Sequence, residues 1–255
     1  MLHRHSRSGQ KLDVAGLNEI TVIIDRSETE LTEVGLNAWC PGLDGPPHAH
    51  DQKEQNFLVT AGRGEVRIGA EKFPASPGTF FFVPARTIHQ TINHSPDKRL
   101  EYFLFNAFLD ATKEGHASFA DHIAKVKETR RQQAASQSAA ADPALAGGRV
   151  MRPGKRVALT DCTGARTVLV GRAETERCET ILHQLGGGQT VREAPDSTKE
   201  QTLFVLSGSG RFTLGTESGG LADGDVLFVP GGTGLEVSAG PDGLRFVSFG
   251  TLVRR

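Results

Sequence analysis

The chain has 255 residues, of which 37% are hydrophobic and 23% charged, and this length suits one large or two small globular domains. Its 29 basic and 30 acidic residues give a net charge of −1, which excludes a general binder of nucleic-acid backbones, because that function needs a strong basic excess. No apolar run reaches the ~18 residues that span a bilayer, no signal peptide is readable, and three scattered cysteines form no disulfide framework, so we expect a cytoplasmic protein without membrane contacts.

The first part of the chain has the pattern of an all-β domain. Short β-branched and aromatic runs are separated by Gly, Pro and Asp at intervals of roughly 8–12 residues. Examples are "NFLVTA" at 56–61, "EVRIG" at 65–69 and "TFFFVP" at 79–84. Such short and evenly spaced strands are typical of a β-sandwich or a β-barrel.

A different segment follows. Residues 118–132 begin with Ser-x-x-Asp, which resembles a capping box, and Phe119, Ile123 and Val126 recur at helical spacing. We expect a short amphipathic helix that covers a barrel or a dimer face. The next stretch, "AASQSAAADPALAGG" at 134–148, is rich in Ala and Ser and nearly uncharged, which predicts a flexible linker.

The strand pattern then returns, because the chain repeats itself without a gap after 146 residues. About a quarter of the overlaid positions are identical, and Phe103 lies over Phe249. The aligned pairs are "TVIIDRSETELTEVGL" (21–36) with "TVLVGRAETERCETIL" (167–182), "KEQNFLVTAGRG" (53–64) with "KEQTLFVLSGSG" (199–210), and "PGTFFFVP" (77–84) with "DGDVLFVP" (223–230). We infer an internal duplication with a first β-domain at 1–106, helix and linker at 107–150, and a second β-domain at 151–255.

The first copy carries a candidate metal site. His48 and His50 are two residues apart, so on a strand both side chains leave the same face. Gln55 lies where the strand pattern restarts, and His89 follows the turn after "TFFFVP". Three neutral imidazoles and an amide carbonyl suit one divalent transition metal: Fe, Mn, Ni, Co, Cu or Zn. No cysteine is near, which favours an open catalytic site over a closed structural one.

These residues resemble the two motifs of the cupin superfamily. The first motif reads Gly42, His48-Ala-His50, four residues, Gln55, six residues, Gly62, and the second reads Gly78, Pro84, His89 and Asn93. The resemblance is specifically to bicupins. It implies an all-β protein of two tandem double-stranded β-helix (jelly-roll) barrels, with a metal held in the first barrel by His48, His50, Gln55 and His89.

Gln55 stands where that family usually has Glu. Glu54 is adjacent and would match a three-residue spacing, but we favour Gln55, because its gap to Gly62 fits and strand parity puts Glu54 on the other face. A neutral Gln leaves a net site charge near +2, which makes the cation a stronger Lewis acid. This version is similar to the cupins that linearise unsaturated uronates and to the bicupin isomerase of bacilysin biosynthesis, whereas three-histidine iron sites occur in cupin dioxygenases.

The second copy lacks this chemistry. The 146-residue offset places Ala194, Asp196 and Leu235 at the positions of the three histidines, and only Gln201 repeats its counterpart. The turn residues persist at Gly208, Gly210, Gly224 and Pro230. We therefore expect a second barrel that is retained for packing or for an interface and binds no transition metal.

Other side chains are candidates for lining the substrate pocket. Phe57, Phe80 and Phe82 either line the pocket or pack in the core, with the core favoured for at least two of them. Arg86 would steer a substrate carboxylate or be a solvated turn charge. Tyr102 would be a general acid or a hydrogen-bonded core residue. The remaining histidines are expected to be exposed: His94, His116, His122 and His183.

Three functions are consistent with these residues. The first is a metal-dependent enzyme that isomerises, tautomerises or cleaves a small oxygenated metabolite by Lewis-acid chemistry, with a general base that the sequence does not identify. The second is a mononuclear non-haem Fe(II) dioxygenase, and the third is a non-catalytic sugar- or metabolite-binding protein. The expected partners are a small-molecule substrate and a second copy in a homodimer, which would form through uncovered sheet edges or through the second barrel.

Overall fold

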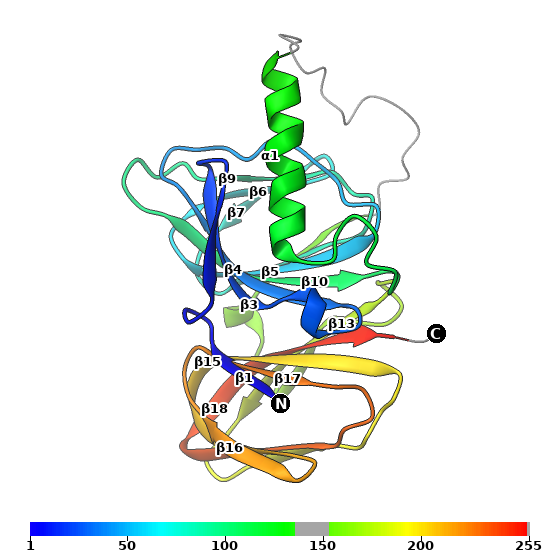
Figure 1. Ribbon diagram of the computed structural model, residues 1–255. Coiled ribbons are helices and arrows are strands. Elements are labelled where there is room, and N and C mark those ends of the chain that lie inside the picture. Colours follow the sequence, from blue (N-terminus) through cyan, green and yellow to red (C-terminus); the bar gives the residue numbers. More distant parts are fainter. Residues whose placement is uncertain (136–152, 254–255) are drawn as a thin grey trace.

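The computed structural model describes residues 1–135 and 153–253 (Figure 1). The predicted linker at 134–148 lies almost wholly outside these residues. No helix of the described chain is long and apolar enough to cross a membrane. The described chain is nearly all strand, which confirms the all-β expectation, and it contains one α-helix, α1 (Phe119–Ala135), and two short 3₁₀ helices, η1 (Arg26–Glu28) and η2 (Leu159–Asp161).

Six strands of the first half belong to a seven-stranded sheet, whose seventh strand comes from the second half, and three more form a three-stranded sheet. All the pairings are antiparallel. The strands of this first barrel are β2 (Gln10–Val14), β3 (Asn18–Ile24), β4 (Thr32–Trp39), β5 (Lys53–Ala61), β6 (Gly64–Ile68), β7 (Glu71–Ala75), β8 (Thr79–Val83), β9 (His89–Ile92) and β10 (Leu100–Phe108). Helix α1 stands against this barrel (Figure 1).

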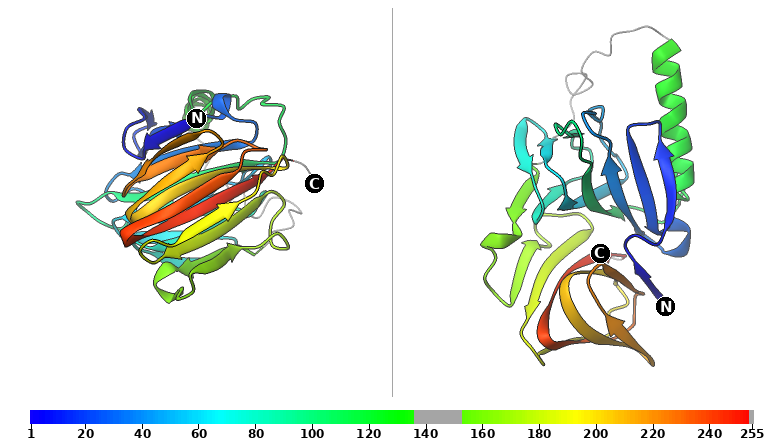
Figure 2. Two further views of the ribbon diagram at one scale, coloured as in Figure 1. Left: turned by 90° about the horizontal axis from the view of Figure 1, so that it is seen from below. Right: turned by 90° about the vertical axis from the view of Figure 1, so that its left-hand side faces the viewer.

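Seven strands of the second half belong to an eight-stranded sheet that curls into the second barrel (Figure 2), and the eighth strand comes from the N-terminus. They are β12 (Arg166–Val170), β13 (Cys178–Leu185), β14 (Thr190–Glu193), β15 (Lys199–Leu214), β16 (Glu217–Leu221), β17 (Asp225–Val229) and β18 (Leu235–Leu252). The expected tandem of two barrels is therefore present.

The two barrels exchange edge strands. The N-terminal strand β1 (Leu2–His5) pairs with β17 of the second barrel, and β11 (Lys155–Ala158) pairs with β8 of the first (Figures 1 and 2). Each exchanged strand covers an edge that would otherwise present unpaired backbone groups. Cutting the chain at the predicted boundaries, 106 and 151, would therefore remove one strand from each sheet.

Strands β4, β5 and β10 have two buried faces. Alternate residues point into the first barrel, and the residues between them pack against the second barrel. On the latter side Phe103 stacks on Phe204 of the second barrel with ring centroids 4.2 Å apart. Phe80 and Phe82 belong to the same buried cluster. The largest apolar core thus lies between the barrels and makes them one packed unit.

Two buried glutamates, one in each barrel, accept hydrogen bonds from the other barrel across this interface. The Glu54 carboxylate accepts hydrogen bonds from the backbone N–H groups of residues 176–178 at 2.9 to 3.1 Å, and from the Thr175 hydroxyl. Its counterpart Glu200 accepts from the N–H groups of residues 30 and 31 and from the Thr32 hydroxyl, at 2.7 to 3.0 Å. The glutamate of the recurring Lys-Glu-Gln triplet therefore makes interface hydrogen bonds in both copies. This role does not depend on which residues line the interior of each barrel.

Strand register corrects part of the 146-residue alignment. Phe103 pairs with Leu36, and Leu182, the counterpart of Leu36, pairs with Val247. The last strand is therefore offset by 144 residues, and the prediction that Phe103 corresponds to Phe249 is wrong. The ungapped alignment missed this shift because both strands carry alternate aromatic residues.

His183 is buried in the second barrel, so the expectation that it is exposed is wrong. It is 2% exposed, its Nε2 lies 3.1 Å from Ser248 Oγ, and its ring stacks on Phe246. Burial lowers the pKa of His183 to about 4.

We expect His183 to make folding stability depend on pH. Since its unfolded pKa is about 6.5, the unfolded chain binds more protons, and lowering the pH from 7.5 to 5 costs about 2 kcal/mol of unfolding free energy through this group. His183→Gln should lose that part of the pH dependence in urea unfolding, whereas His94→Gln, at an exposed position, should keep the wild-type dependence. Equal slopes for all three proteins would contradict the assignment.

Candidate metal centre

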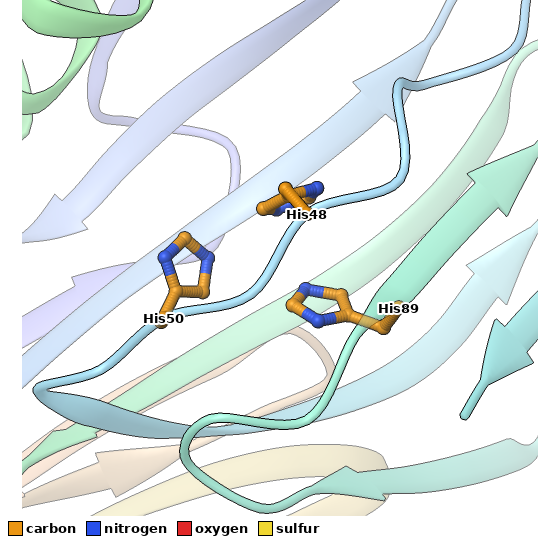
Figure 3. A group of neighbouring side chains, drawn as sticks. All are labelled: His48, His50 and His89. Carbon is orange, nitrogen blue, oxygen red and sulfur yellow. The ribbon is translucent and has the colours of Figure 1, made fainter. Parts of the chain in front are cut away.

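Three histidines converge at the mouth of the first barrel (Figure 3). One ring nitrogen of each of His48, His50 and His89 lies within 4.8 Å of the others. His48 and His89 face each other as an isolated bridge, with reciprocal backbone hydrogen bonds of 3.0 and 2.9 Å. His50 follows in an irregular segment rather than on the strand expected from the sequence. Nevertheless, the three imidazoles point toward a common centre.

Backbone carbonyls orient two of the rings. His48 Nδ1 lies 3.0 Å from the Pro46 carbonyl oxygen, and His89 Nδ1 lies 3.1 Å from that of Thr87. With the proton on Nδ1, each ring carries its lone pair on Nε2, which is the form that binds a metal. Burial, and next the charge of Lys53, holds the pKa of His50 well below its usual value. Burial, and next His48, does the same for the pKa of His89. Both rings are thus neutral near pH 7.

Gln55 adds an oxygen without a partner. Its Oε1 is buried and has no hydrogen bond within the described structure, whereas its Nε2 donates to Asn106 Oδ1 at 2.9 Å. A buried acceptor without a partner costs about 1–3 kcal/mol. Gln55 points into the same cavity as the three imidazoles. The residues present therefore fit a metal ion, with Gln55 Oε1 as the fourth ligand atom.

Behind Gln55 lies a chain of buried polar groups, which we call the Glu33 relay: Glu33, Asn106, Gln55 and His116. Asn106 Nδ2 donates to Glu33 Oε2 at 2.7 Å, and the other carboxylate oxygen lies 2.9 Å from His116 Nε2. Glu33 and Asn106 are fully buried. Because Asn106 gives its N–H to the carboxylate, its oxygen is left to hold the N–H of Gln55, which turns Gln55 Oε1 toward the histidines.

A cavity of about 340 Å³ opens in front of these groups. Its wall combines aromatic and amide side chains with two lysines, Lys53 and Lys125, and no aspartate or glutamate of the described chain lines it. Helix α1 closes one side, with Phe119 and Ile123 buried against the barrel core. This matches the expectation that the helix covers a barrel.

The structure separates the five predicted pocket residues. Phe57 and Tyr102 line the cavity, whereas Phe80 and Phe82 pack between the barrels and Arg86 pairs with Glu176 of the second half. Arg86 therefore does not face the cavity, contrary to its reading as a guide for substrate.

Tyr102 is held as a buried acceptor. Asn37 Nδ2 and Trp39 Nε1 each donate to its hydroxyl oxygen at 2.9 Å. Burial raises the pKa of Tyr102. These contacts favour the hydrogen-bonded core role over that of a general acid.

Sequence reasoning missed two residues of the cavity wall. Lys53 is two positions before Gln55 on β5, so strand parity alone places it on the same face. His122 lies on α1 beside the buried Ile123, and its ring is 5.8 Å from that of His50 and stacks on His116 at 4.6 Å. The expectation that His116 and His122 are exposed is therefore wrong; only His94 is exposed as expected.

The second barrel has filled the corresponding site. Glu193 pairs with Leu235 across the strands, as His48 pairs with His89, so Glu193 rather than Ala194 replaces His48. Its carboxylate accepts from Gln201 Nε2 at 3.1 Å and from Lys199 Nζ at 3.2 Å. Within the described ranges, His48, His50 and His89 form the one group of three metal-ligating side chains.

Comparisons with known proteins agree with this architecture. Residues 39–105 match the family model described as "Cupin domain". No curated relative matches the sequence. Among solved structures, protein Ylba from E. coli is 11% identical with a TM-score of 0.70, over 99% of this chain and 91% of that chain.

Two oxalate decarboxylases are also similar in fold. The Lactobacillus farciminis enzyme, solved as a formate complex, is 12% identical with a TM-score of 0.67, over 100% of this chain and 87% of that chain. The Bacillus subtilis enzyme, described with Mn(II) centres, is 14% identical with a TM-score of 0.65. The match covers 100% of this chain and 78% of that chain. The first barrel thus contains a segment that matches the cupin domain, and the whole chain has the two-barrel fold of these solved structures.

Proposed function

We propose that the first barrel is the active site of a metal-dependent enzyme. His48, His50 and His89 would hold one divalent transition metal, with Gln55 Oε1 as the fourth ligand. The observation that carries this proposal is the buried Gln55 oxygen, which has no partner among the described residues, beside three converging imidazoles. The Mn(II) centres named for the Bacillus subtilis oxalate decarboxylase support a divalent ion in this fold.

The reaction we favour is isomerisation, tautomerisation or bond cleavage without redox change. When bound, the ion would polarise a carbonyl or carboxylate oxygen of a small oxygenated metabolite as a Lewis acid. The four ligands are neutral, so they leave the full charge of the ion to act on that oxygen. The chain itself would orient the ligands through the Glu33 relay and exclude water with helix α1.

An Fe(II) dioxygenase is the second candidate, because the cluster is a set of three histidines without a carboxylate ligand. Oxygen uptake by the Fe(II)-reconstituted protein in the presence of diketones or catechols would separate it from the first. A binding protein is the third candidate, and it would bind such compounds without turning them over.

Elemental analysis of the purified protein tests the metal directly. We expect about one divalent metal per chain in the wild type, and almost none in His89→Ala, because three-ligand coordination is broken. His94→Ala is the matched control, since His94 is an exposed histidine outside the cluster, and it should keep the metal. Wild-type protein that stays free of metal after reconstitution would refute both enzyme proposals and leave the binding protein.

A further inference from the structure

Lys53 is a buried lysine whose ammonium contacts no counter-ion among the described residues. Its side chain is 4% exposed and lies on the strand face that also carries Gln55 and Phe57. Within the described residues its side chain makes neither a hydrogen bond nor an ion pair, and Nζ lies 5.5 Å from the centroid of the Phe108 ring. A buried charge without a counter-ion costs several kcal/mol. A lysine in this environment is therefore a candidate for binding an anionic ligand.

Glu33 does not supply the missing partner. It is the carboxylate with the largest electrostatic effect on Lys53, and it opposes the effect of burial, which lowers the pKa of Lys53 to about 8. However, the two oxygens of Glu33 are already engaged by Asn106 and His116. Arg26 adds a further positive charge nearby. The positive charge of Lys53 is therefore balanced only by an electrostatic effect of Glu33, without an ion pair.

The second barrel shows what its lysine binds. Lys199, the counterpart of Lys53, donates to the Glu193 carboxylate, which Gln201 also holds. The strand position of Glu193 is occupied in the first barrel by His48, so the Lys-Glu-Gln triplet there has lost its internal carboxylate. Among the described residues, the wall of the histidine cavity offers no other carboxylate. Lys53 also lines a neighbouring pocket, where Asp51, Asp110 and Glu114 are found.

From this geometry we infer that the ligand of the first barrel is a small carboxylate, and that the Lys53 ammonium binds its carboxylate group. The inference deepens the proposed function by naming the class of substrate, and it rests on that function for the use of this cavity. A ligand carboxylate would accept a hydrogen bond from Lys53, as the Glu193 carboxylate accepts one from Lys199 in the second barrel. Its remaining oxygen atoms would lie toward the three histidines.

Calorimetric titration with malonate tests the inference on the full-length protein, with and without reconstituted metal. Malonamide, of the same size but uncharged, is the ligand control. We expect malonate to bind the wild type, Lys53→Met to weaken binding roughly tenfold or more through loss of a charge-assisted hydrogen bond, and Lys53→Arg to retain most of it. Lys199→Met is the matched control in the second barrel and should bind malonate like the wild type.

Thermal unfolding distinguishes this role from a structural one. If Lys53 served mainly as the counter-ion of Glu33, Lys53→Met would lower the Tm, whereas removal of an unpartnered charge should leave it unchanged or raise it. Malonate binding equal in wild type and Lys53→Met, absent from the wild type, or matched by malonamide would overturn the inference. Metal content of the same samples is read separately. Binding that depends on Lys53 in protein that takes up no metal supports the inference and refutes the proposed enzyme.

Discussion

Glu54→Ala should lower the free energy of unfolding by about 3–5 kcal/mol, the range for removing one partner from a buried charged network. The substitution leaves three backbone N–H groups and the Thr175 hydroxyl facing an apolar void between the barrels. Each unsatisfied buried donor costs about 1–3 kcal/mol, and relaxation of the loop recovers part of that. Urea unfolding followed by circular dichroism measures the effect.

The internal duplication provides the matched comparison. Glu200→Ala removes the symmetry-related contact and should cost a similar amount, whereas Glu71→Ala, at an exposed position, should cost little. Folded Glu54→Ala should also retain its metal, because Glu54 faces the second barrel. Loss of metal without loss of stability would show instead that Glu54, and not Gln55, is the ligand.

Strand parity predicted that the neighbouring residues Glu54 and Gln55 have different roles. Alternation along β5 placed Glu54 and Gln55 on opposite faces, and the structure has Glu54 in the interface and Gln55 in the cavity. The same argument was available for Lys53, which shares the face of Gln55. The motif spacing likewise indicated the histidine cluster, because the turn between β8 and β9 brings His89 back to His48.

Parity failed where both faces of a strand are buried. All five residues of β8 are buried, so the sequence has no polar alternation to distinguish the cavity from the space between barrels. Phe80 and Phe82 therefore could not be assigned to one side. The exchange of β1 and β11 is also invisible locally, because an edge strand pairs with whichever edge the other half of the chain presents.

Asn106→Leu should weaken metal binding by about 10- to 100-fold, the usual effect of losing a group that orients a ligand. Leucine removes the oxygen that holds Gln55 Nε2 and leaves Glu33 Oε2 without its donor. The Gln55 amide could then rotate and present its NH₂ group to the histidines. Competition with a chromogenic chelator, on protein stripped of metal and then reconstituted, gives the dissociation constant.

The second barrel supports a role of this arrangement in the proposed metal site rather than in the fold. Strand register puts Gly250 at the position of Asn106, and Gln201 there turns to Glu193 instead. A barrel without the histidines thus folds without the relay. Gln201→Leu should accordingly leave the metal dissociation constant unchanged. If Asn106→Leu binds the metal within about twofold of the wild type while remaining folded, then the histidines alone set the affinity, and the orientation of Gln55 does not depend on the Glu33 relay.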